Sequence, residues 1–366
     1  MSYSLSWLHQ NTGANTTAIL VPFFNEAGDS EHFKQRLAYF DELANSLPEQ
    51  VDIILIDDGS NDAPANYVQQ NYRRLSVAQV SPNGQKIGAL QRTIDELSHD
   101  YIIFTDFDTE LENLACLEQT YEKLAADDNC MGCYFKMMPI ANRKPVVQFQ
   151  VLEYALERAA YHFNAHEGSV PIMPGAGCLY KRPIIKALLA QHSGLRSGED
   201  RETCLLGIEQ GYTVFYESDV VAMTAPPQSF WALYQQRVRW SRGFIEVAIN
   251  KSDFYKQQMR SKTILGRRHL LDIISVSTFL IAPLLLLLMF NVSDTVGWWF
   301  LAIWSAIGIA ETYSVYRVAK QEFKQIPQHR WQLLLMPFAR LMLEVPTWWS
   351  VTSAMVWQRF RRGRVS

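Results

Sequence analysis

The stretch Tyr101-Ile102-Ile103-Phe104-Thr105-Asp106-Phe107-Asp108 joins a short apolar run to two acidic residues. An apolar run of this length, bounded by polar residues, is typical of a strand buried in a parallel sheet. Ligands bind outside the carboxyl ends of strands in open α/β sheets, and both acidic residues follow such an end. Because alternate residues of an extended chain point the same way, the two carboxylates can face one cation. We expect Mg²⁺ or Mn²⁺, which proteins hold with one or two carboxylates and substrate phosphates. A solvated acidic turn is the alternative.

The chain before residue 265 alternates short β-branched runs with longer helical patterns. The predicted strands are 18–23, 51–56, 77–80 and 101–105. The predicted helices between them are 31–46 and 84–97. Such alternation indicates right-handed βαβ units in an α/β domain, with a mostly parallel, Rossmann-like sheet and flanking helices. We place this domain at residues 17–250, after a polar N-terminal tail over residues 1–16.

The composition argues against several classes of protein. A formal net charge of −3 provides no basic field, so we expect no nucleic-acid partner. The five cysteines indicate a reducing compartment rather than a disulfide framework. Cys130 and Cys133 lie in an apolar run and are interpreted as part of a buried strand. The first 17 residues lack the apolar core of a signal peptide.

The C-terminal region 268–366 is strongly apolar and is predicted to lie in a membrane. Two stretches, near 270–290 and 296–317, are long enough to cross a bilayer as helices. Their connector lacks Lys and Arg, whereas basic residues flank the other ends of the pair. The positive-inside rule therefore places the preceding domain in the cytoplasm. We expect a multi-pass protein of the cytoplasmic (inner) membrane.

A third apolar segment, residues 331–357, contains charged residues and prolines. Two interpretations stay open for it: an interfacial helix that lies on the membrane, or a third span. A helix near 229–250 is also predicted to lie at the membrane surface.

Further polar motifs follow other predicted strands. Val21-Pro22-Phe23-Phe24-Asn25-Glu26 ends the first strand, and Asp57-Asp58-Gly59-Ser60 ends the second. Acidic residues in such places bind the base or ribose of a nucleotide. Asn83-Gly84-Gln85-Lys86 opens a helix whose free amides and lysine suit a diphosphate. Ordinary loops and helix caps explain the same residues without a ligand.

Two motifs lie later in the chain. Glu199-Asp200 follows a glycine, and a carboxylate there can act as a general base, although acidic residues also favour helix N-termini. Gln236, Arg239 and Trp240 share one face of a predicted helix. A guanidinium group suits a diphosphate and an indole suits a sugar ring, while a basic amphipathic helix on a membrane is the alternative.

In this order, the motifs resemble the family 2 glycosyltransferases, a membrane-bound inverting group with a GT-A fold. Cellulose, chitin and hyaluronan synthases and ceramide glucosyltransferase are members. The matching segments lie within about residues 17–245 and are Val21-Pro22-x-x-Asn25-Glu26, Asp57-Asp58-Gly59-Ser60, Asn83-x-x-Lys86, Asp106-x-Asp108, Gly175-Ala176-Gly177, Glu199-Asp200 and Gln236-x-x-Arg239-Trp240.

The resemblance implies a role for each matching residue. Residues expected to bind the donor nucleotide are Pro22, Asn25, Glu26, Asp57, Asp58, Lys86 and Asp106. Asp106 and Asp108 would hold the metal, and Asp200 would be the general base. Residues expected near the diphosphate and the acceptor are Gln236, Arg239, Trp240, Gly175, Ala176, Gly177 and Glu199. The small residues of the Gly175 segment would leave space for the acceptor.

The expected activity is therefore inverting sugar transfer from a nucleotide-diphosphate donor, a UDP-sugar, at the cytoplasmic membrane face. The acceptor is either a lipid that receives one sugar or a growing polysaccharide, the latter with partner subunits for export. The small number of predicted spans favours the lipid acceptor, because a translocating polymer needs a polar channel enclosed by several helices. A non-catalytic sugar-nucleotide-binding membrane protein is a remote alternative that would lack one acidic motif, and none is lacking.

Overall fold

The computed structural model describes residues 4–10, 16–26, 30–61, 64–195, 197–318, 320, 322–323 and 331–362. The chain forms two compact units, which are described separately. The first comprises Met1–Met137 and Gly168–Ala225, and the second comprises Met138–Glu167 and Pro226–Ser366. The second unit includes α5 (Pro145–Asn164) and α8 (Phe230–Asn250), because both helices pack against the C-terminal helices. The catalytic domain over residues 17–250 stays a prediction.

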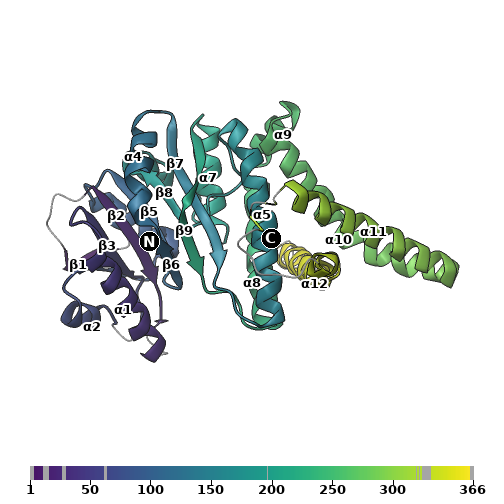
Figure 1. The fold of residues 1–366 in the computed structure, drawn as a ribbon, viewed down its shortest axis with the longest axis horizontal. Coiled ribbons are helices and arrows are strands. Elements are labelled where there is room, and N and C mark those ends of the chain that lie inside the picture. The colour runs from purple at the N-terminus through teal and green to yellow at the C-terminus, as the bar shows by residue number, and fades with distance from the viewer. Residues whose placement is uncertain are drawn as a thin grey trace. The chain divides into compact units, whose positions relative to one another are not determined.

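In the described residues, the first unit is built on a nine-stranded sheet with the order β1-β4-β3-β2-β5-β8-β7-β9-β6 (Figure 1). The strands are β1 (Ser4–His9), β2 (Thr17–Phe23), β3 (Val51–Asp57), β4 (Leu75–Ser81), β5 (Tyr101–Phe104), β6 (Thr109–Glu112), β7 (Cys130–Pro139), β8 (Cys178–Lys181) and β9 (Thr213–Thr224). The predicted α/β fold class is confirmed, and the predicted strands match β2, β3, β4 and β5 to within one or two residues.

The sheet is mixed rather than uniformly parallel. β4, β3, β2 and β5 are parallel neighbours. β8 pairs antiparallel with both β5 and β7, and β6 pairs antiparallel with β9. β2 and β3 are almost completely buried, as their uninterrupted apolar sequences require at the centre of a covered sheet.

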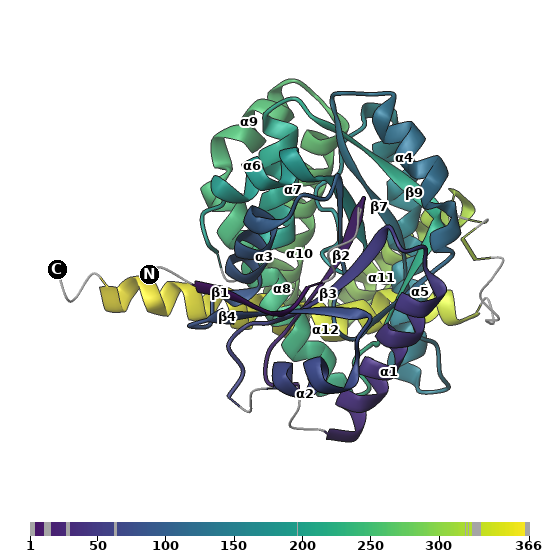
Figure 2. The same ribbon diagram turned by 90° about the vertical axis from the view of Figure 1, so that its left-hand side faces the viewer.

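Helices cover both faces of this sheet. α1 (Ser30–Ser46) and α4 (Leu117–Ala125) lie on one face, and α3 (Gln85–Glu96), α6 (Arg182–Ala190) and α7 (Glu199–Glu209) lie on the other (Figure 2). A further helix, α2 (Pro64–Asn71), connects β3 to β4. The apolar core lies between the sheet and these two helical layers.

The segment that we expected to be a polar tail contains an edge strand. Residues 4–9 form β1, which pairs antiparallel with β4. The alternation Ser4-Leu5-Ser6-Trp7 is the pattern of a strand with one half-buried face. Trp7 Nε1 also donates to Glu96 Oε2 at 2.7 Å, which attaches the strand to α3.

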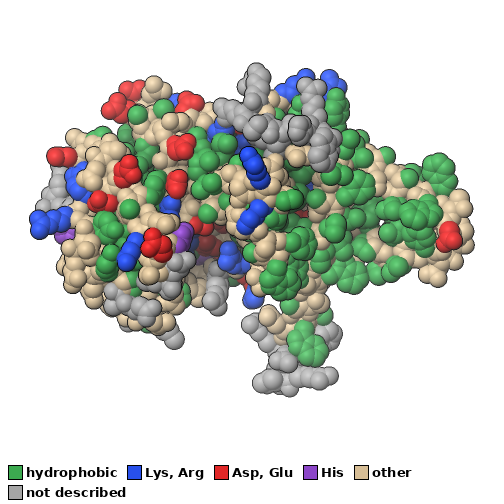
Figure 3. Space-filling view, turned by 60° about the horizontal axis from the view of Figure 1, so that its bottom comes forward, with side chains coloured by type: hydrophobic (Ala, Val, Ile, Leu, Met, Phe, Trp, Pro, Cys, Tyr) green, Lys and Arg blue, Asp and Glu red, His purple; other side chains and the backbone are tan. Residues whose placement is uncertain are grey.

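The second unit is helical. Besides α5 and α8, it contains α9 (Ser252–Arg260), α10 (Ile264–Val292), α11 (Asp294–Val318) and α12 (Trp331–Arg362). Among the described helices, α10 is the one that is long and apolar enough to cross a membrane. Large apolar side chains lie exposed along the C-terminal helices (Figure 3). One candidate span is therefore established, and the multi-pass arrangement stays a prediction.

Two buried glycines give a test of this packing. A Cβ atom on Gly132 of β7 would lie 2.1 Å from the carbonyl oxygen of Leu179 on β8. A Cβ atom on Gly207 of α7 would lie 2.1 Å from the Met131 sulfur, which belongs to an adaptable side chain. We expect Gly132→Ala to lower the free energy of unfolding by at least about 1–3 kcal/mol. Gly207→Ala should cost less, since alanine also favours a helix by about 1 kcal/mol. Thermal unfolding of both purified variants checks this order, and equal losses would contradict it.

Candidate functional site

Asp58 links the end of β3 to the start of α3. Its Oδ1 accepts a hydrogen bond from the Gly84 amide at 2.6 Å, and its carbonyl accepts one from Asn83 Nδ2 at 2.7 Å. Gly59, at φ +75°, permits this approach, because a Cβ there would lie 3.0 Å from the Asn83 nitrogen. Burial raises the pKa of Asp58 to about 6, although the Gly84 hydrogen bond opposes the shift.

Asp57 and Asn25 organise the loops that follow β3 and β2. Asp57 is fully buried, and its carboxylate accepts from the Ser60 amide at 2.9 Å and from Gln79 Nε2 at 3.3 Å. Asn25 lies at φ 56°, and its Oδ1 accepts from the Asn61 amide at 3.1 Å. Asp57 therefore holds the turn from inside, whereas Asp58 lies between the turn and α3.

The two other predicted residues of the first loop differ in exposure. Pro22 is half-buried within β2, and Glu26 is exposed. Pro22 fixes the exit of the strand, and the Glu26 carboxylate lies in solvent beside Asn25.

Lys86 connects Asp106 and Asp200, which belong to two of the acidic motifs of the first unit. Its Nζ forms an ion pair with Asp106 Oδ1 and donates to the Gly175 carbonyl at 3.4 Å. The Gly175 amide in turn donates to Asp200 Oδ2 at 3.4 Å. Burial lowers the pKa of Lys86, but Asp106, Glu199 and Asp200 outweigh it and hold the pKa above its usual value. One ammonium group thus lies within the field of three carboxylates.

Asp106 and Asp108 lie on the turn between β5 and β6. The Thr109 amide donates to the Asp106 carbonyl at 3.0 Å, which closes the turn. Phe107 between them is buried, with its ring centroid 5.5 Å from those of Phe23 and Phe33. Burial of the middle residue leaves the two carboxylates on the outside of the turn, where Asp108 is exposed.

The donor set of this turn fits a hard divalent cation that a substrate helps to bind. The described residues contain no cluster of three or more His, Cys, Asp or Glu that could hold a metal alone. Two carboxylates supply part of the octahedral oxygen shell that Mg²⁺ and Mn²⁺ prefer, and diphosphate oxygens and water can complete it.

Glu199 and Asp200 begin α7. Gly198 precedes them in the left-handed region at φ 77°, and Asp200 Oδ1 accepts from the Arg201 amide at 2.8 Å. Burial raises the pKa of Asp200, with Lys86 opposing the shift. Burial and the charge of Asp200 raise the pKa of Glu199. A raised pKa makes a carboxylate a stronger base, which suits proton abstraction.

The glycines of Gly175-Ala176-Gly177 serve packing as well as access. A Cβ on Gly177 would lie 2.8 Å from Ala222 Cβ and 2.9 Å from the Met137 sulfur, so this glycine fits against the protein. Ala176 is also buried. A Cβ on Gly175 would lie 3.1 Å from Lys86 Nζ and 3.5 Å from Asp200 Cβ. Gly175 is therefore the member of this segment that borders the site.

Gln236, Arg239 and Trp240 lie on α8 in the second unit. Arg239 and Trp240 are exposed, and Gln236 Oε1 is buried without a hydrogen-bond partner in the described structure. Arg237 lies over the Trp240 ring at 4.5 Å and forms an ion pair with Glu153 of α5. The sequence prediction did not include Arg237 or Glu153, whose link depends on how α5 packs against α8.

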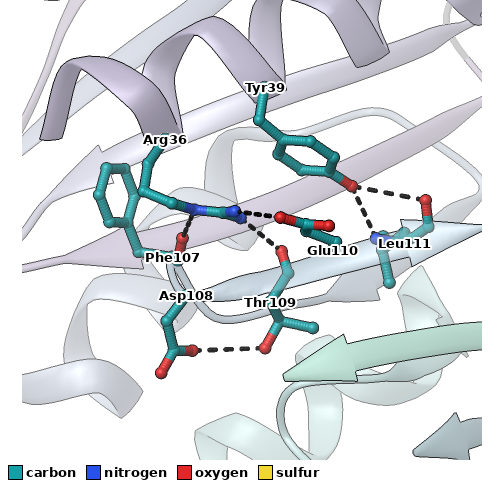
Figure 4. Close-up of polar contacts among 7 residues, drawn as sticks. All are labelled: Arg36, Tyr39, Phe107, Asp108, Thr109, Glu110 and Leu111. Atoms are coloured by element: carbon teal, nitrogen blue, oxygen red, sulfur yellow. Dashed lines mark hydrogen bonds and ion pairs between the residues drawn. The ribbon is translucent and has the colours of Figure 1, made fainter. Parts of the chain in front are cut away.

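Arg36 of α1 was also missed. It is buried, and it donates to the backbone around Phe107 and Thr109 (Figure 4). The available signal was an arginine on the face of a helix otherwise occupied by Phe33, Leu37 and Phe40.

Comparisons with known proteins agree with this geometry. Residues 19–243 match the family model described as glycosyltransferase like family 2, which covers more than half of the chain. The chain therefore belongs to this family, and the predicted resemblance is confirmed. It is 27% identical over 244 residues to an N-acetylglucosaminyltransferase of Rhizobium sp. (strain N33), covering 61% of this chain and 51% of that protein.

Two further proteins extend the comparison. A poly-beta-1,6-N-acetyl-D-glucosamine synthase of Staphylococcus aureus (strain COL) is 26% identical over 222 residues, covering 59% of this chain and 53% of the synthase. The chain thus spans about half the length of the curated relatives it matches. A mannosyltransferase from Pyrobaculum calidifontis, solved with GDP-Man and Mn²⁺, has a TM-score of 0.57 at 17% identity and covers 92% of this chain and 90% of that one. This likeness supports the GT-A fold.

The pKa of Asp58 predicts a pH dependence of stability. The carboxyl group titrates near 3.8 in the unfolded chain and near 6 in the folded protein. Between these pH values the folded state binds more protons, so the free energy of unfolding falls as pH rises. Asp58→Asn removes this effect. Between pH 4 and pH 7, its free energy of unfolding should therefore rise by about 1–3 kcal/mol relative to that of wild type. Unfolding curves across this range measure the difference. The exposed substitution Asp128→Asn is the control. A difference in the free energy of unfolding between Asp58→Asn and wild type that does not change with pH would contradict the assignment.

Proposed function

We propose that this chain transfers a sugar, with inversion, from a nucleotide-diphosphate donor to an acceptor hydroxyl. The observation that carries the proposal is the contact sequence Asp106–Lys86–Gly175–Asp200 within the first unit. It joins a carboxylate suited to a metal, a cation suited to a diphosphate and a carboxylate suited to a general base. Family membership supports the same reaction class.

The donor nucleotide would bind across the loops after β2 and β3. Asp58 is the acidic residue proposed to meet the base or ribose, because both carboxylate oxygens of Asp57 already accept hydrogen bonds, one from the Ser60 amide and one from Gln79 of β4. Pro22, Asn25 and Glu26 would form the adjoining wall. Lys86, in the first turn of α3, would bind the diphosphate. We retain UDP as the proposed nucleotide, with GDP as the alternative to test.

Asp106 and Asp108 would hold Mg²⁺ or Mn²⁺ together with the diphosphate. The bound ion would neutralise charge on the departing diphosphate. Lys86 already lies at Asp106 and would add a second positive charge there. From α8, Arg239 would contact the diphosphate, while Gln236 and Trp240 would contact donor or acceptor.

Asp200 would act as the general base. It would accept the proton of the acceptor hydroxyl as that oxygen attacks the anomeric carbon. The bond from this carbon to the diphosphate oxygen breaks at the same time, and the diphosphate leaves. Glu199 would lie beside the acceptor, and its charge contributes to the field around Asp200.

A glycan is the acceptor that the relatives favour, since their names describe N-acetylglucosamine transfer and polymer synthesis. A membrane lipid is the second candidate, because apolar side chains lie exposed along α10 in the second unit. Either acceptor agrees with attachment to the cytoplasmic membrane. Exposed Phe230 and Trp231 at the start of α8 suit the membrane interface. A polymer product would require partner subunits for export.

The base assignment predicts a selective loss. Asp200→Asn should lower the transfer rate by about 10²–10⁴-fold, because general-base catalysis contributes a factor of this size. The affinity for UDP or GDP in the presence of Mn²⁺, measured by calorimetry, should change little. Glu209→Gln, an exposed change on the same helix, is the matched control. Unchanged turnover in Asp200→Asn would exclude this carboxylate as the base.

Metal removal tests the other half of the site. Membranes that contain the protein should convert one of a panel of UDP- and GDP-sugars in the presence of Mn²⁺. EDTA should abolish this conversion, and added Mn²⁺ should restore it. Asp108→Asn should weaken the response to Mn²⁺. Mass spectrometry of the products distinguishes a single glycolipid from a polymer, and full activity in EDTA would contradict a metal on this turn.

A further inference from the structure

The turn between β5 and β6 depends on one side chain from outside the predicted motifs. Arg36 of α1 donates from Nε to the Phe107 carbonyl at 2.7 Å and from Nη2 to the Thr109 carbonyl at 2.9 Å. Its Nη1 also forms an ion pair with Glu110 Oε1 at 2.8 Å. Figure 4 shows the guanidinium group between α1 and this turn, with Asp108 on the adjoining backbone.

The carbonyl groups of the turn show how much of it Arg36 holds. Asp106 O accepts from the Thr109 amide at 3.0 Å, and Asp108 O accepts from the Ala225 amide at 3.2 Å. The two remaining carbonyls of residues 106–109 accept from Arg36. Hydrogen bonds from a charged donor are stronger than neutral ones, and the planar guanidinium fixes the direction of both.

We propose that Arg36 is a positioning residue for metal and donor binding: it fixes the backbone from which the Asp106 and Asp108 carboxylates project. This inference rests on the proposed function for the metal itself. Among the described contacts, Arg36 forms no hydrogen bond or ion pair with either carboxylate, and the effect of its charge on Asp108 is one that a lysine would keep. The proposed role therefore lies in the turn that Arg36 holds. The affinity for a cation that only two protein ligands hold depends strongly on the separation of those ligands. Loss of a group that orients metal ligands typically reduces metal affinity about 10–100-fold.

The surroundings of Arg36 are built to hold its guanidinium in one place. The group lies over the Tyr39 ring at 4.6 Å and 5.3 Å from the centre of the Phe40 ring. Tyr39 extends the support, since its hydroxyl accepts from the Leu111 amide at 2.6 Å. Phe40 and Phe107 have ring centroids 5.8 Å apart, so α1 contacts both a side chain and the backbone of the turn.

The competing explanation is that Arg36 serves only the stability of the fold. The two explanations differ in what Arg36→Lys does. Lysine keeps the positive charge, but a single ammonium on a flexible stem does not reproduce two directed bonds to two carbonyls together with the Glu110 pair. A lysine at this position would retain a role that depends on the charge alone. It would not retain a role that depends on the geometry of the guanidinium group.

The experiment measures Mn²⁺ binding directly in the full-length protein in detergent. Mn²⁺ is titrated by electron paramagnetic resonance with UDP, and separately with GDP, for wild type, Arg36→Lys and Arg36→Met. The control is Arg74→Met, which removes a part-buried arginine that donates to the Ala44 carbonyl at 2.9 Å. Hydrogen exchange of residues 107–111 and the melting temperature are recorded on the same samples.

We expect Mn²⁺ affinity to fall about 10–100-fold in both Arg36 variants and to stay at the wild-type value in Arg74→Met. Exchange of the 107–111 amides should accelerate in the Arg36 variants, and nucleotide binding in EDTA should not change. Wild-type Mn²⁺ affinity in Arg36→Lys, or unaltered exchange of these amides, would overturn the positioning role. If wild type itself binds no Mn²⁺ with either nucleotide, the metal assignment fails instead, and the inference that rests on it fails as well.

Discussion

The burial of β5 in the middle of the sheet decides where the chemistry of the first unit lies. β5 is parallel to β2 on one side and antiparallel to β8 on the other, and Ile102 and Ile103 are fully buried. The chain must leave the sheet after Phe104, because β6 pairs at the far edge with β9. It turns at the carboxyl end of β5 and leads away from β2, since β8, β7 and β9 separate β5 from β6. Asp106 and Asp108 lie on that turn.

Charge balance explains why this arrangement calls for cations. Lys86 pairs with Asp106 and lies within the field of Glu199 and Asp200, so one ammonium faces several carboxylates. A diphosphate adds further negative charge, which is costly to place beside carboxylates in a partly buried site. A divalent ion held by Asp106 and Asp108 would offset that cost.

The sequence predicted the central strands well because β2, β3 and β5 are buried on both faces and read as uninterrupted apolar runs. It also predicted which motifs follow strand ends, and topology then brings several of them together. β1 was missed because an edge strand of alternating residues resembles a polar tail. Arg36 could not be predicted, since its partners are backbone carbonyls, which have no signature in the sequence. The packing role of Gly177 likewise depends on Ala222 and Met137, which are distant in the chain.

The motif on α8 divides between support and binding in a way that its sequence does not reveal. Arg237 is buried, pairs with Glu153 and covers one face of the Trp240 ring. Its charge is therefore already neutralised within the second unit, and a diphosphate would have to displace Glu153 to use it. Arg239, by contrast, is exposed and open to a ligand. Trp240 remains 43% exposed, so the indole has surface left for a sugar ring. Of the two adjacent arginines, Arg239 is thus the one suited to a ligand, and Arg237 is the one that orients the tryptophan.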